Sequence, residues 1–245
     1  MSTSNYTAKI LKIYHHRGGK LDWLNYLYSM AASLIYCYDA YCGWCYAFSK
    51  VMQQLASDYP ELSIEVFSGG MILPEKPVPL KVTADYIRQA YPKVEALSGI
   101  EFGADYLWHI ENPDLSDWYP NSEKPAIALC IFKEIYPDKQ VAFAADLQYA
   151  LYWEGRDLTD DEAYRHLLEK YSLSEEYFYT RLHDEAYKQL AHDEFENCRQ
   201  LKVTGYPCVF VQNSEVSFTL IARGYTDYAT LRERLQNVLT ENNPG

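Results

Sequence analysis

Basic charge is scarce in this sequence. The 245 residues include 22 Lys and Arg against 34 Asp and Glu, which gives a formal net charge of −12 at pH 7. A surface of that sign repels nucleic acid and anionic membranes alike. We therefore expect neither as a partner.

Long apolar runs are also missing. None approaches the roughly 18 residues that a transmembrane helix needs. The N-terminus has no basic segment followed by a continuous apolar stretch and a small-residue cleavage site. These absences predict no membrane-spanning segment and a cytoplasmic protein.

Cysteine is sparse as well. Six cysteines in a chain of this length do not form the dense framework of a small secreted scaffold, and only Cys42 and Cys45 are closely spaced. This usage fits a reducing compartment and indicates that the one close pair is reactive.

What is present begins with a strand, a helix and a second strand. Residues 34–38 form a short apolar and aromatic run typical of a buried strand. Apolar residues then recur at helical spacing over 44–58, so Cys42 falls at the start of a helix. Residues 62–67 alternate with period two and end at a glycine turn, which predicts a parallel βαβ unit.

The rest of the chain divides into a helical block and a return to mixed structure. Helical patterns with capping signals dominate from residue 81 to 183, and a helix, two strands (208–211 and 218–221) and a terminal helix follow. The pattern predicts an α/β fold with a large all-helical insertion. Its three parts are a peripheral N-terminal extension (1–32), an α/β domain (33–80 and 184–245) and the helical insertion (81–183).

The spacing of Cys42 and Cys45 carries the chemistry. Two positions three residues apart share one face of a helix, so the sulfurs can close a disulfide with little strain. The positive end of the helix favours a thiolate at its start, which predicts Cys42 as the exposed nucleophile of low pKa and Cys45 as the buried resolving thiol. Exchange of this kind requires no metal and no cofactor.

A metal site is the alternative use of such a pair, because Cys-x-x-Cys is also the knuckle of zinc modules. A zinc site needs a second close pair of Cys or His ligands. Cys198 and Cys208 are separated by nine residues that include a turn and Pro207. A non-catalytic protein that binds a metal or a partner through its acidic surface stays open as a hypothesis.

The segment from Tyr38 to Tyr46, with the motif Cys42-Gly43-Trp44-Cys45, resembles the active-site segment of the DsbA-like oxidoreductases, especially the FrnE-like branch. The resemblance extends over most of the chain from about Ser33. It implies a thioredoxin-like fold whose insertion lies between the second strand and the cis-proline strand. It also implies exchange of disulfides with protein or small thiol substrates through Cys42 and Cys45.

Substrate contacts follow from the same resemblance. Tyr206-Pro207 looks like the family's cis-proline position, where the residue before the proline offers backbone groups to an extended substrate. Tyr206 is bulkier than the usual residue there, so we expect a narrower or reshaped groove. We expect one of two roles for Trp44: it either binds apolar substrate side chains or packs against the insertion.

The direction of the reaction is left open by the residues between the two cysteines. They are Gly43 and Trp44, not the Pro-His of the periplasmic oxidant that names the family. A glutathione-dependent isomerase or transferase of the kappa-like type is the nearest enzymatic alternative, although relatives of that type use a single activating residue at the position of Cys42. The oligomeric state is not indicated.

The other cysteines are expected to be structural. Cys37 and Cys130 lie in apolar patterns and are predicted to be buried and inert. Cys208 directly follows Pro207, so its side chain faces either the active site or the sheet core. Cys198 is either the partner of Cys208 or an ordinary helix residue. Asp39 either influences the thiols or simply ends the strand.

Overall fold

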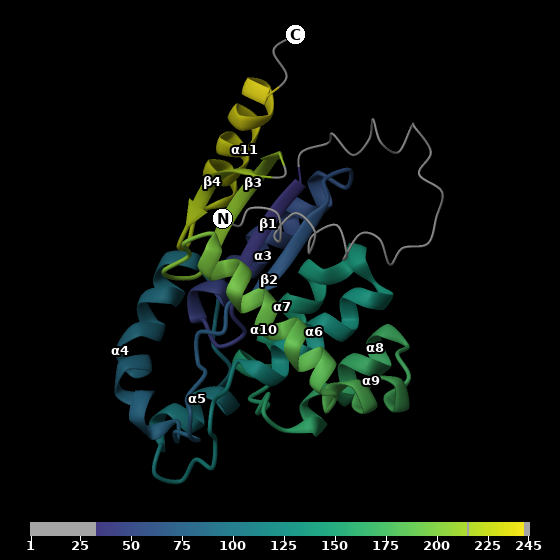
Figure 1. Cartoon of the computed structure of the whole chain (residues 1–245). Helices are drawn as coiled ribbons and strands as arrows, with labels where there is room; N and C mark the ends of the chain where they lie inside the picture. Colours follow the sequence, from purple (N-terminus) through teal and green to yellow (C-terminus); the bar gives the residue numbers. More distant parts are fainter. Residues whose placement is uncertain (1–32, 215, 243–245) are drawn as a thin grey trace.

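The computed structural model of this chain describes residues 33–214 and 216–242 (Figure 1). The peripheral extension predicted over residues 1–32 lies outside these described residues.

A four-stranded mixed sheet with the order β2-β1-β3-β4 forms the centre of the fold. Its strands are β1 (Ser33–Tyr38), β2 (Ile64–Ser68), β3 (Cys208–Ser214) and β4 (Ser217–Arg223). β1 runs parallel to β2 and antiparallel to β3, and β3 and β4 form a hairpin. The parallel βαβ unit predicted from the sequence is confirmed.

Helix α3 (Gly43–Asp58) connects the two parallel strands. Its buried side chains include Cys45, Phe48, Met52 and Leu55. That spacing of three and four residues places them on one face, so burial of this face against the sheet holds the helix in position. The helix ends just before Pro60, which disfavours a helical conformation at the preceding residue.

The insertion is entirely helical among the described residues between β2 and α10. Its helices are α4 (Lys81–Ser98), α5 (Ala104–Glu111), α6 (Glu123–Ile135), α7 (Gln140–Tyr152), α8 (Arg165–Tyr171) and α9 (Glu175–Leu182), with 3-10 turns η1 (Pro137–Lys139) and η2 (Asp161–Tyr164). The chain then returns through α10 (Glu185–Gln200), the β3–β4 hairpin and α11 (Tyr228–Asn242). This element order confirms the α/β class and the thioredoxin-like fold with an insertion before the cis-proline strand.

Two helix pairs join the insertion to the sheet. α7 packs along α3, and α6 packs along α10, which itself contacts β2. Figure 1 shows α10 running from the sheet into the helical block. Helix α3, which begins at the cysteine pair, therefore packs between the sheet and the insertion.

The boundaries differ from the sequence-based expectation in a few places. α5 was not predicted, because eight residues are too few for a helical period to stand out. Within the predicted helical block, residues Asp161–Tyr164 form a 3-10 turn, and the side chain of Asp160 caps it by accepting a hydrogen bond from the Glu162 amide. β3 continues to Ser214 because it pairs with β4 over that length.

The sheet separates a large core from a small one. The large core lies on the face that carries Tyr36, α3 and most of the insertion. The small core on the other face consists of Ile35, Cys37, Cys198, Cys208 and Phe210. No helix in the described part of the chain is long and apolar enough to cross a bilayer.

Candidate active site

The cysteine pair lies where β1 gives way to α3. Cys42 is the N-cap of the helix, and its carbonyl accepts hydrogen bonds from the amides of Cys45 (2.9 Å) and Tyr46 (3.0 Å). The first amides of a helix have no partner within it and point out of its end. The Cys42 residue therefore lies at the positive end of the α3 dipole.

The two thiols differ in burial. Cys45 is completely buried, whereas Cys42 keeps 6% of its surface exposed. Both are free thiols, as are the other four cysteines. Burial, together with a hydrogen bond and the charge of Cys42, raises the pKa of the Cys45 thiol well above its ordinary value. Cys42 was predicted to be exposed, but the structure buries it, because it lies beneath the Tyr206 backbone; it is still more accessible than Cys45.

The Tyr206–Pro207 peptide bond is cis, as the resemblance implied. It stands directly before β3, and the thiol of Cys42 donates a hydrogen bond of 3.5 Å to the Tyr206 carbonyl. Pro207 is buried, and its own carbonyl accepts a hydrogen bond from the Gly224 amide at 2.7 Å. The fold thus brings Cys42, Cys45, Tyr206 and Pro207 together from segments more than 160 residues apart.

The side chain of Tyr206 packs against Gly69, at the end of β2. The Tyr206 hydroxyl donates a 2.8 Å hydrogen bond to the Gly69 carbonyl. A Cβ added to Gly69 would lie 2.1 Å from the Tyr206 ring, so only glycine fits beneath it. The bulk of Tyr206 is accommodated by this contact, while its backbone carbonyl is left facing Cys42.

Asp39 is a buried carboxylate three residues before Cys42. One oxygen accepts from the Tyr41 amide (3.0 Å) and the Ser122 hydroxyl (2.9 Å), and the other accepts from the Met71 amide (2.7 Å). These donors come from the cysteine loop, the insertion and the loop after β2. Asp39 therefore both ends the strand and ties three segments together beside the thiols.

Trp44 lies half-buried between the two cysteines in sequence. Its ring is 6.4 Å from that of Tyr225, which follows β4. This contact places one aromatic neighbour of Trp44 just after β4, and both roles expected for Trp44 stay predictions.

Three cysteines cluster on the opposite face of the sheet. Cys37 lies directly across from Cys208 on the neighbouring strand, and Cys198 of α10 completes the cluster. All three are buried, so Cys208 faces the sheet core and not the active-site pair. The hydrogen bond with Cys37 and burial raise the pKa of the Cys198 thiol. Cys198 lies with Cys37 as well as Cys208, which the sequence spacing did not indicate.

A metal site would need several His, Cys, Asp or Glu side chains of the described residues to lie close together. None of their His, Cys, Asp and Glu side chains gather in a group of three or more that could hold a metal ion.

Two contacts beside the pair were missed by sequence reasoning. The glycine at position 69 was read only as part of a turn, and the Ser122 hydroxyl was not considered. Each depends on a partner far away in the chain, 137 residues for Gly69 and 83 for Ser122. No local periodicity carries such information.

Comparison with solved structures identifies the fold. A protein disulfide isomerase candidate from Nitrosomonas europaea matches with a TM-score of 0.73 and 23% identity, covering 87% of this chain and 100% of that one. The cytosolic disulfide reductase DsbM from Pseudomonas aeruginosa matches with a TM-score of 0.68 and 23% identity, covering 85% and 99%. A 2-hydroxychromene-2-carboxylate isomerase matches with a TM-score of 0.60 and 16% identity, covering 86% and 97%.

No curated protein matches the sequence itself. The family model described as a DSBA-like thioredoxin domain, however, matches residues 34–236, which include β2, β3, β4, all but the first residue of β1, and the cysteine pair. On that match the chain belongs to the DsbA-like thioredoxin-domain family.

Proposed function

We propose that this protein is a thiol–disulfide oxidoreductase in which Cys42 is the attacking thiol and Cys45 the resolving thiol. The observation that carries the proposal is the position of the Cys42 sulfur, at the N-terminus of α3 and 3.5 Å from the Tyr206 carbonyl. A substrate strand laid beside Tyr206 and Pro207 meets that sulfur.

Substrate binding is proposed to use the backbone before the cis-proline. An extended peptide can pair with the exposed polar groups of a strand edge, as in other cases of strand addition. The Tyr206 side chain is engaged with Gly69, so the backbone at this position does not depend on a mobile ring. Trp44 offers an apolar surface for the neighbouring substrate side chain.

In the reducing direction, the Cys42 thiolate attacks one sulfur of a substrate disulfide. A Cys42–substrate disulfide forms, and the second substrate sulfur leaves as a thiolate that takes up a proton. Cys45 then loses its proton, attacks the Cys42 sulfur and releases the first substrate sulfur as a thiolate. The products are a reduced substrate and a Cys42–Cys45 disulfide, which a low-molecular-weight thiol reduces again.

The raised pKa of Cys45 suits the second step. A thiol that stays protonated at neutral pH does not compete with Cys42 for the substrate. It becomes a nucleophile only when the mixed disulfide is held beside it. Cys42 therefore forms the mixed disulfide with the substrate first, and Cys45 releases the substrate in a second step.

The direction and compartment are proposed from the pair and from the neighbours together. DsbM is named a cytosolic disulfide reductase, and it has also been solved with GSH. We propose that this chain likewise works in a reducing compartment, the cytoplasm, as a reductase or isomerase. Glutathione is the proposed thiol that resets the pair.

Reduction of insulin by wild type, Cys42→Ser and Cys45→Ser tests the proposal. We expect activity in wild type only, and a stable mixed disulfide between Cys42 and substrate in Cys45→Ser, visible by mass spectrometry. The Cys208→Ser variant, altered on the other face of the sheet, is the matched control and should retain activity. Equal activity of wild type and Cys42→Ser would sink the proposal.

The second candidate is a glutathione-dependent isomerase or transferase of the kappa-like type. It is favoured by the match to an isomerase that shares the inserted fold. Such an enzyme needs only the residue at position 42, so glutathione-dependent turnover that survives Cys45→Ser would support it over disulfide exchange.

A further inference from the structure

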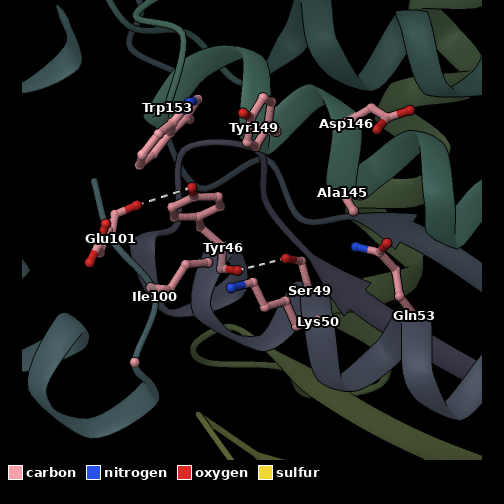
Figure 2. A pocket seen from close by; sticks show the side chains of 11 residues that line it. Tyr46, Ser49, Lys50, Gln53, Ile100, Glu101, Ala145, Asp146, Tyr149 and Trp153 are labelled. Atoms are coloured by element: carbon pink, nitrogen blue, oxygen red, sulfur yellow. Dashed lines mark hydrogen bonds between the residues drawn. The ribbon is translucent and has the colours of Figure 1, made fainter. Parts of the chain in front are cut away.

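A cavity of about 400 Å³ lies between α3 and α7, closed at one end by residues 99–101 (Figure 2). It is formed where the insertion packs along the helix that carries the cysteine pair. This volume falls within the range of pockets that hold small organic ligands, about 300–1,000 Å³.

The α3 side of the cavity presents two exposed polar side chains. Lys50 and Gln53 lie along this side (Figure 2). Within the described part of the chain, the Lys50 ammonium makes no ion pair and the Gln53 amide makes no side-chain hydrogen bond. Both groups can donate hydrogen bonds to a ligand, and one of them carries a full positive charge.

The α7 side is aromatic. The rings of Tyr149 and Trp153 are stacked with their centroids 6.0 Å apart, and they remain 45% and 40% exposed. Tyr46 closes the wall between the two sides, with its hydroxyl held by the Glu101 carbonyl at 3.2 Å. Large flat surfaces left open beside a cavity can stack on the flat face of a ligand.

Two acidic residues, Asp146 and Glu101, also line the cavity. The Asp146 carboxylate is occupied, because Lys170 lies 2.7 Å from it and the Tyr171 hydroxyl donates to it at 2.6 Å. The Glu101 side chain lies at the opposite end from Gln53 (Figure 2). An anionic group placed between Lys50 and Gln53 would face the Lys50 ammonium and lie toward the end of the cavity away from the Glu101 carboxylate.

We propose that this cavity binds a small organic anion with a flat apolar body, such as an aromatic carboxylate. The carboxylate binds the Lys50 ammonium and the Gln53 amide, and the ring stacks against Tyr149 and Trp153. The inference does not depend on disulfide exchange, because neither cysteine of the pair lines the cavity.

Binding of phenylacetate and of its neutral counterpart phenylacetamide, measured by isothermal titration calorimetry on the reduced full-length protein, tests the proposal. The two probes share shape and ring, and they differ in charge. We expect the carboxylate to bind about tenfold more tightly than the amide. Lys50→Met should remove that difference, and Tyr149→Ala should weaken both probes.

Lys139→Met is the matched control, since Lys139 is an exposed lysine in η1 outside the cavity lining. It should leave both affinities unchanged. The Cys42→Ser variant should bind phenylacetate as wild type does, which separates this site from the redox pair. Three results would overturn the proposal: no binding of phenylacetate, equal binding of the two probes, or a preference for the acid that persists in Lys50→Met.

Discussion

At the scale of single residues, Asp39 has the most concentrated set of contacts near the thiols. Its two carboxylate oxygens receive three hydrogen bonds from three separate segments. Hydrogen bonds to a charged group each contribute about 1.5–3 kcal/mol to stability. Burial nevertheless raises the pKa of this carboxyl, because desolvation outweighs the backbone and hydroxyl donors.

Asp39→Asn should lower the free energy of unfolding by about 1–3 kcal/mol, because the amide turns an NH₂ group toward a donor. Urea unfolding followed by circular dichroism measures this loss. Asp138→Asn, at an exposed position in η1, is the control and should change little. If Asp39→Asn lowers the free energy of unfolding no more than Asp138→Asn does, the hydrogen bonds of Asp39 do not stabilise the fold as expected.

The pH dependence of this difference has a definite sign. A carboxyl whose pKa is raised on folding contributes stability that is fully present below its unfolded value, near 3.8, and lost as pH rises through the folded value. Wild type should therefore gain stability relative to Asp39→Asn as pH is lowered from 7 toward 4. A constant difference over this range would show that Asp39 titrates normally.

Gly69 and Tyr206 form the other close contact near the pair. Gly69→Ala places a Cβ inside the Tyr206 ring, so the ring must move and stability should fall by about 1–3 kcal/mol. In a Tyr206→Ala background the same change should cost much less. A double-mutant cycle on unfolding free energies measures the coupling, and additive effects would contradict it.

The residue scale is where sequence alone predicts least. Cys42 and Cys45 were predicted because their spacing is local. The ring position of Tyr206 and the three donors to Asp39 depend on partners from distant segments, which no window of the sequence contains. The cis-proline position of Tyr206 and Pro207 was implied by family resemblance and not by pattern, and the hydrogen bond from Cys42 to the Tyr206 carbonyl was not predicted.

At the scale of elements, a buried ion pair joins α6, α10 and β2. The Lys133 ammonium lies 2.6 Å from Glu194 and 3.3 Å from Glu65, and it donates to the Val66 carbonyl. Glu194 in turn accepts from the Ser68 amide at 2.9 Å. Burial lowers the pKa of Lys133, but the two carboxylates outweigh it, so the pKa is raised and the charge is retained.

Lys133→Met should lower the free energy of unfolding by about 3–5 kcal/mol, because it leaves Glu194 buried without a counter-charge. Lys170→Met removes an exposed partner of Asp146 and should cost about 1 kcal/mol or less. Urea unfolding of both variants gives the comparison. Similar losses of unfolding free energy in the two variants would show that the buried pair contributes no more to stability than the exposed one.

Elements were predicted well where their signals are local. Ser174 caps α9 by accepting a hydrogen bond from the Tyr177 amide, and it is one of the capping signals within the block predicted to be helical. The ion pair of Lys133 could not be predicted, because a lysine at the end of an amphipathic helix usually faces water. Its partners come from two other elements that only the folded chain brings together.

At the scale of the whole molecule, all six thiols are buried in the free form. Native protein treated with iodoacetamide at neutral pH should be alkylated at Cys42 alone, because that sulfur is partly accessible at a helix N-terminus. The same reagent in denaturant should modify all six. Peptide mass spectrometry locates the label, and rapid native labelling of Cys45 would contradict the proposed division between the two thiols.

The order of elements predicted the fold class, because strand, helix and strand followed by a helical block leaves few arrangements. The division into an α/β domain and an insertion with the stated boundaries stays a prediction. How the insertion lies on α3 could not be predicted. The cavity between α3 and α7 exists only through that packing.

The register of the sheet has a consequence for synthesis on the ribosome. Ser33 in β1 pairs with Gln212 in β3, so one edge of β1 has no neighbour until nearly the whole chain has emerged. A nascent chain that already contains β1, β2 and the insertion carries an open, apolar strand edge, which invites pairing with other chains. Pairing of β3 with β1 therefore closes, late in synthesis, the edge of a sheet whose first strand was made long before.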